Sequence, residues 1–276
     1  MTCLNIHRFR PLRRAAASAF LLALAACSSA PKDEYVERPV EELYNEALDK
    51  LHADENAAAA KLFDEVERQH PYSTWATRAQ LMAAYAHYQE GQYDDALNAI
   101  DRFLQLHPGN PSAPYAYYLR ALCYYEQIAD VTRDQKDTEL ALGSLEELVR
   151  RYPDSAYARD AQLKIDLTKD HLAGKEMEIG RYYLRRGEYQ AAINRFRQVI
   201  EHYQTTSQVP EALHRLTEAY LALGVVEEAQ TAAAVLGHNF PGSTWYADSY
   251  LLLTGVDVNP EEHKDSWISR TFGAIF

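Results

Sequence analysis

The chain has 276 residues, a formal net charge of −12 at pH 7 and 20 tyrosines. This acidic balance excludes a typical nucleic-acid-binding protein, because such proteins need a surplus of Lys and Arg to neutralise phosphates. Hydrophobic residues make up 47% of the chain and charged residues 25%, which is ordinary for a folded, water-soluble body.

The first 26 residues have the pattern of a bacterial lipoprotein signal peptide. Residues 1–14 carry four Arg and no acidic residue, and the apolar run 15–26 is too short to span a bilayer. The run leads into LAAC (24–27), which resembles the lipobox. That resemblance implies cleavage before Cys27 and a diacylglycerol and an N-acyl chain on Cys27, with no other cofactor. Ser28 implies sorting to the outer membrane, facing the periplasm. The alternative is an ordinary signal peptide with a chance Cys.

Residues 27–40 follow as the lipidated N-terminus and a flexible tether. Residues 28–40 have two Pro, mixed charges and no helical period, and could extend about 40–45 Å at ~3.3 Å per residue. Without the leader, 24 basic residues face 40 acidic ones, a net charge near −16. Such an acidic body is not attracted to anionic lipid, so we expect the acyl chains alone to hold it at the membrane.

Residues 41–254 contain an internal repeat with five members in one register. Each member has two small or short residues, a residue four positions after the second that is larger in four of the five members, and a closing Pro or Gln. Small residues let antiparallel helices approach closely, the larger residue fills the gap one turn on, and Pro ends the second helix. Gly91, Gly187 and Gly224 permit a left-handed turn after the first helix. The first small residue is Ala47, Ala84, Ala121, Gly180 or Thr217, and the second is Ala59, Ala96, Ala141, Ala192 or Ala229. The residue four positions later is Phe63, Ile100, Leu145, Phe196 or Ala233, and the closing residue is Pro71, Pro108, Pro153, Gln204 or Pro241.

This pattern resembles the tetratricopeptide repeat and implies an all-α fold, an α-solenoid of about five helix pairs. The closing positions are separated by 37, 45, 51 and 37 residues. The two longer units carry extra sequence at 128–137, between two helices, and at 155–174, which we interpret as one long helix. We therefore predict front repeats over 41–153, with a peptide-binding groove, and a partner-binding half over 154–254, with the long helix and the back repeats.

Two similar phrases mark the ends of the first and fifth units: HPYSTWA (70–76) and FPGSTWYA (240–247). In each, Pro stops one helix and a Ser or Thr can cap the next. The C-terminal tail, 255–276, departs from the repeat pattern. Its Ile268, Phe272, Ile275 and Phe276 fall at helical spacing and predict a short amphipathic helix, which either caps the last repeat or docks on an accessory lipoprotein.

No catalytic motif is recognisable, so we expect no catalytic residue and no enzymatic activity. We also expect no metal site, because the potential ligands in EEHKD (261–265) are consecutive and do not converge on one ion. Cys123 is expected to be a small buried hydrophobe. Stacked helix pairs leave a groove for extended segments, and its candidate residues here are Tyr44, Tyr85, Tyr88, Tyr115 and Tyr118. The alternative is that these rings pack between repeats.

Three stretches go beyond a generic repeat: AIDRFLQLHPGNPSAPYAYYLRAL (99–122), RRYPDSAYARDA (150–161) and KEMEIGRYYLRRGEYQAAINRF (175–196). They resemble the BamD family, lipoproteins of the outer-membrane β-barrel assembly (BAM) machinery. The resemblance implies a scaffold that binds BamA, through its periplasmic POTRA domains, and other BAM-complex lipoproteins. It also implies that the front repeats receive targeting segments of unfolded barrel proteins.

The resemblance assigns a role to one further residue. In the family, an Arg in the second helix of the fourth unit pairs with an acidic POTRA residue, and the matching residue in INRF (193–196) is Arg195. The alternative for Arg195 is a solvated helix residue. The alternative for the whole chain is a repeat lipoprotein that recruits peptidoglycan hydrolases or pilus and secretin components.

Overall fold

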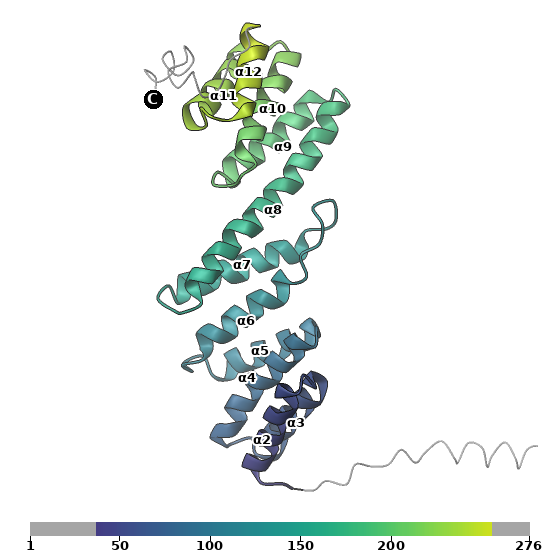
Figure 1. Cartoon of the computed structure of the whole chain (residues 1–276), viewed down its shortest axis with the longest axis vertical. Coiled ribbons are helices and arrows are strands. Elements are labelled where there is room, and N and C mark those ends of the chain that lie inside the picture. Colours follow the sequence, from purple (N-terminus) through teal and green to yellow (C-terminus); the bar gives the residue numbers. More distant parts are fainter. Residues whose placement is uncertain (1–36, 256–276) are drawn as a thin grey trace, which may run out of the picture. The chain divides into compact units, whose positions relative to one another are not determined.

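The computed structural model describes residues 37–255, and this range folds into eleven α-helices with no strand (Figure 1). The predicted all-α fold is therefore confirmed. Cys27, the leader, residues 27–36 of the predicted tether and the tail 256–276 lie outside the described residues. The helices are α2 (Val40–His52), α3 (Asn56–Gln69), α4 (Thr74–Gln89), α5 (Tyr93–Leu106), α6 (Ala113–Tyr125), α7 (Lys136–Arg151), α8 (Ala158–Arg185), α9 (Tyr189–His202), α10 (Val209–Ala222), α11 (Val226–Asn239) and α12 (Thr244–Thr254).

The helices form five antiparallel pairs followed by one extra helix. The pairs are α2–α3, α4–α5, α6–α7, α8–α9 and α10–α11, and α12 packs on both α10 and α11. Each second helix also packs on the next first helix, so every helix contacts its neighbours in the chain, as Figure 1 shows. The buried apolar side chains accordingly form successive clusters between adjacent pairs, as expected of a repeat array.

The turns inside the pairs adopt the predicted left-handed conformation. Gly91, Gly187 and Gly224 have φ between +75° and +76°, and each ends a first helix two residues before the second begins. In the first unit the same register position holds Asp54, which also has a positive φ, +58°. This conformation costs Asp some energy, because Asp has a Cβ. Asp tolerates it better than most residues, since its short side chain can hydrogen-bond to the nearby backbone.

The small residues lie where the helices of a pair cross. Nine of the ten predicted small positions are 0% exposed, and the tenth, Gly180, is also buried. The residues four positions after the second small residue are 0% exposed as well. The tightest crossing is α8 on α9: a Cβ at Gly180 would lie 2.4 Å from Cε1 of Phe196. A Cβ at Gly237 in α11 would similarly lie 2.5 Å from the Tyr246 ring of α12.

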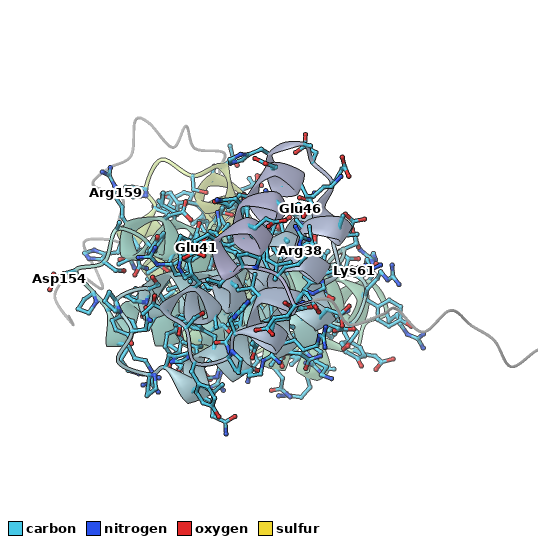
Figure 2. The ribbon with its side chains drawn as sticks, turned by 90° about the horizontal axis from the view of Figure 1, so that it is seen from below. Arg38, Glu41, Glu46, Lys61, Asp154 and Arg159 are labelled. Carbon is cyan, nitrogen blue, oxygen red and sulfur yellow. The ribbon has the colours of Figure 1, made fainter. Side chains whose placement is uncertain are left out.

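The two phrases that end the first and fifth units have the predicted capping role. The Ser73 side chain accepts a hydrogen bond from the Ala76 backbone N–H at the start of α4, and the Ser243 side chain accepts one from Trp245 at the start of α12. Figure 2 shows charged side chains pointing outward from the helices, among them Glu41 on α2, Lys61 on α3 and Arg159 on α8, all of which are exposed.

The long helix extends further than the sequence suggests. We expected it over 155–174, but α8 runs without a break from Ala158 to Arg185 and also serves as the first helix of the fourth pair. The insertion between α6 and α7 packs on it. His171 Nε2 lies 2.7 Å from the Ala129 carbonyl oxygen, to which it donates, and Lys175 Nζ donates to the carbonyls of Thr132 and Arg133 at 3.0 Å each.

Among the helices of residues 37–255, none combines the length and the apolar character that crossing a bilayer requires.

Candidate functional site

Tyrosine rings gather where the first helices of the second and third pairs meet the start of α8. We call this group the tyrosine cluster: Tyr85, Tyr88, Tyr115, Tyr118 and Tyr157. Tyr157 stacks on Tyr118 with ring centroids 5.1 Å apart and lies 5.5 Å from Tyr115. All five rings are half-buried, so their bodies pack between repeats while part of each ring faces solvent.

Burial raises the pKa of three hydroxyls in this cluster. It raises the pKa of Tyr115 and Tyr118 well above the ordinary value, and it raises the pKa of Tyr88 to about 12, with Glu126 adding to the effect. Tyr88 Oη donates to Glu126 Oε1 at 3.4 Å, and Tyr118 donates to Asp160. Acidic side chains thus hold the hydroxyls of Tyr88 and Tyr118, and the rings of the cluster offer apolar area suited to contact with apolar segments.

Tyr44 does not belong to this surface, which corrects the sequence-based expectation. Its side chain is only 9% exposed, and its ring packs 5.4 Å from Phe63 and 4.9 Å from Trp75 in the core of the first pair. We therefore remove Tyr44 from the groove candidates.

The open face of α6 continues past the cluster to a shallow depression of about 270 Å³. It is lined by Tyr125, Ile128, Leu167, Thr168 and His171. Tyr125 lies two turns from Tyr118 on the same face of α6, because residues seven apart share one side of a helix. Leu167 and the neighbouring Leu163 are each 60% exposed, which is unusual for Leu. From the sequence, Tyr125 is expected to face the groove, but the contribution of the α8 leucines was missed, although leucines at i and i+4 in 155–174 were the visible signal.

Arg195 lies on α9 and is not simply solvated. Its Nη1 donates to Glu176 Oε2 on α8 at 3.0 Å, and the Arg195 side chain remains 42% exposed. The pair borders a cavity of about 270 Å³ that is also lined by Tyr183, Ala191, Asn194 and Gln198. Sequence reasoning identified Arg195 but missed Glu176, because their contact depends on how the two helices are rotated at the crossing of Gly180 and Phe196.

A second, larger cavity of about 450 Å³ lies on the other side of Glu176. It is bounded by the insertion between α6 and α7 and by α8, and its lining is mainly charged and polar: Thr132, Arg133, Asp134, Gln135, Lys136, Glu139, Lys175, Glu176 and Ile179. The structure therefore brings Arg195 and Glu176 together in the fourth pair, where Glu176 lies on α8 nearly twenty residues after Tyr157 of the tyrosine cluster.

The remaining candidates from the sequence are Cys123, the potential metal ligands and the lipidation residue Cys27. Cys123 is fully buried in α6 as a free thiol, as predicted, and burial raises its pKa to about 12. Within residues 37–255, no three side chains of His, Cys, Asp or Glu converge as a metal site would require. The EEHKD segment at 261–265 and the lipidation candidate Cys27 lie outside the described residues.

Comparisons with known proteins agree along most of the chain. A family model described as YfiO, outer membrane lipoprotein, matches residues 36–236. The chain is 53% identical over 260 residues to "Outer membrane protein assembly factor BamD" of Caulobacter vibrioides, covering 93% of this chain and 85% of that protein. It is 44% identical to the protein of the same name from Rickettsia prowazekii, covering 84% and 92%. Among solved structures, the TPR domain of P58(IPK) matches with a TM-score of 0.41 and 16% identity, covering 88% of this chain and 60% of that chain.

Proposed function

The chain belongs to the BamD family of outer membrane protein assembly factors, and from this premise we propose that it is a lipid-anchored scaffold that connects unfolded barrel proteins to BamA. The scaffold has two working surfaces, the tyrosine cluster on the front repeats and the Arg195 region on the fourth pair. Its role is binding and placement, and the chemistry of barrel insertion is left to BamA.

The tyrosine cluster receives the targeting segments of unfolded outer-membrane proteins. The observation that carries this proposal is the set of half-buried tyrosine rings on α4, on α6 and at the start of α8. Such rings offer large apolar contact area at a low cost in side-chain entropy. They would pack against apolar and aromatic side chains of an extended segment, and the depression beside Tyr125 lengthens the surface available to it.

Arg195 binds an acidic residue in the POTRA region of BamA. The exposed guanidinium and the polar cavity beside it support this role, since a guanidinium can bind a carboxylate through two parallel hydrogen bonds. Lipidation at Cys27 holds the protein to the outer membrane on its periplasmic face, with the folded body standing off the bilayer on the tether.

The groove proposal can be tested with the mature chain and a labelled peptide of alternating apolar residues that ends in Phe. Replacing Tyr88 by Ala should weaken peptide binding by about 1–2 kcal/mol, close to tenfold, because a packed aromatic contact is lost. The matched control is Tyr72→Ala, since Tyr72 is a fully exposed tyrosine outside the cluster. Equal affinity of the two variants, with both still folded, would remove the tyrosine cluster from the proposal.

The partner proposal is tested by affinity purification of the lipidated protein from detergent-solubilised outer membranes. Recovery of BamA with the wild-type chain, reduced by Arg195→Ala, is the expected result. Recovery of peptidoglycan hydrolases or secretin components without BamA would instead favour the recruiting role that the sequence left open.

A further inference from the structure

Glu176 occupies a position between two cavities and is bonded to the residue proposed to bind BamA. Its Oε2 accepts from Arg195 Nη1 at 3.0 Å, and its side chain is 21% exposed against 42% for Arg195. Glu176 lines both the cavity beside Arg195 and the larger cavity under the α6–α7 insertion. Any carboxylate that approaches Arg195 therefore meets a second carboxylate that is already there.

The Arg195 guanidinium is only partly used in this arrangement. It has five N–H donors, and within residues 37–255 its single side-chain hydrogen bond is the one to Glu176. The cavity next to it also presents the amide side chains of Asn194 and Gln198. This lining can donate to oxygen atoms and leaves room for one side chain of a partner.

We propose that Glu176 is an internal competitor for Arg195: it neutralises the guanidinium in the free protein, and an acidic side chain of the partner displaces it on binding. The inference rests on the proposed function, because it concerns the same Arg195 contact. The residue that tunes affinity for the partner is then Glu176 itself. The partner's carboxylate then binds in the cavity that is lined by Asn194, Gln198 and Tyr183.

The larger cavity offers a place for the displaced Glu176. Arg133 and Lys136 line it, and neither has an ion-pair partner in the part of the chain that the structure describes. The adjacent Lys175 is already engaged with the carbonyls of Thr132 and Arg133, which holds the insertion against α8. Rotation of Glu176 away from Arg195 would move its charge toward Arg133 and Lys136. Asp134 and Glu139 line the same cavity, but Arg133, Lys136 and Lys175 still outnumber these two carboxylates.

The competing idea is that Glu176 positions Arg195 for the partner. The two ideas predict opposite signs. A positioning carboxylate helps binding, so its removal weakens the complex. A competing carboxylate cancels the charge that attracts the partner and must be displaced, so its removal strengthens the complex. Two carboxylates near one guanidinium also repel each other, and the partial exposure of the site favours the competing role, because solvent lets Glu176 leave at low cost.

The test measures the affinity of the mature chain for the periplasmic region of BamA, with Glu176→Gln, Arg195→Ala and the double variant. We expect Glu176→Gln to tighten binding roughly two- to fivefold, the range set by the small net strength of partly exposed ion pairs. Arg195→Ala should weaken binding, and adding Glu176→Gln to it should restore nothing. The matched control is Glu178→Gln on the same helix, which removes a carboxylate bonded to Arg181 and not to Arg195.

The outcomes separate this inference from the function on which it rests. If Arg195→Ala weakens binding while Glu176→Gln leaves it unchanged or weaker, the competitor role is wrong and the Arg195 contact stands. A gain from Glu176→Gln that persists without Arg195, or that Glu178→Gln reproduces, is a general charge effect and also overturns the inference. If Arg195→Ala has no effect, the Arg195 contact itself is wrong.

Discussion

Replacing Gly180 by Ala should destabilise the protein even though Ala is the better helix former. The new Cβ would lie 2.4 Å from Cε1 and 2.8 Å from Cδ1 and Cζ of Phe196, a ring with no exposure. Overpacking of this kind costs about 1–3 kcal/mol, whereas Gly to Ala within a helix gains about 0.5–1 kcal/mol. The net loss should be about 1 kcal/mol in the free energy of unfolding, or a Tm lower by roughly 2–4 °C for a domain of this size.

The matched control is Gly143→Ala in the middle of α7, where an added Cβ meets no atom within 4 Å. This variant should show the propensity gain alone, about 0.5–1 kcal/mol. Urea unfolding followed by circular dichroism compares the two midpoints directly. Equal stabilisation by both substitutions would refute the argument that the α8–α9 crossing is closed by Phe196.

The same crossing offers a rescue. The second unit has Ala84 and Ile100 at the positions of Gly180 and Phe196, so combining Gly180→Ala with Phe196→Ile rebuilds a pair that the chain already uses. The double variant should be more stable than the sum of the two single changes by about 1 kcal/mol, within the range measured for contacting residues.

Three further predictions concern single side chains. Asp54→Gly should raise the free energy of unfolding by about 0.5–1 kcal/mol and Asp54→Ala should not, because Asp and Ala both carry the Cβ that a φ of +58° penalises and Gly lacks it; urea midpoints of the two variants check this. Tyr118→Phe should raise the pKa of Asp160, since the hydrogen bond from the Tyr118 hydroxyl is the main cause that lowers it, and NMR titration of Asp160 measures the change. The stabilisation from this bond is present above the ordinary pKa of Asp and disappears as pH falls through the folded-state pKa of Asp160. Burial lowers the pKa of His214 in the folded state, so as pH falls below about 6.5 the unfolded state binds a proton before the folded state does. The free energy of unfolding should therefore decrease below this pH, and His214→Gln should make the urea midpoint less dependent on pH.

The repeat pattern was predictable because its causes are local. Small residues at a helix crossing, a glycine in a left-handed turn and a Ser before a helix each act within a few residues, so the sequence displays them directly. The Arg195–Glu176 bond and the continuation of α8 to Arg185 were not predictable in the same way. The bond requires the rotation of one helix against another, and the helix continues because nothing between the long segment and the fourth unit breaks it.

The burial of Tyr44 was predictable from its position in the repeat, although not from its residue type. Tyr44 stands three residues before the first small residue of its unit, and the same position holds Leu81, Tyr118, Met177 and His214 in the later units. Tyr44, Leu81, Met177 and His214 are all buried, so the repeat register assigns this position to the core.

Tyr118 is the exception at this position, because Tyr157 stacks on its ring and its hydroxyl donates a hydrogen bond to Asp160 at the edge of the core. Tyr85, Tyr88 and Tyr115 occupy other register positions and stay half-exposed. Residue type suggested five equivalent tyrosines, whereas register separates them. A groove on repeats of this kind is therefore better predicted from the position within the unit than from aromatic content.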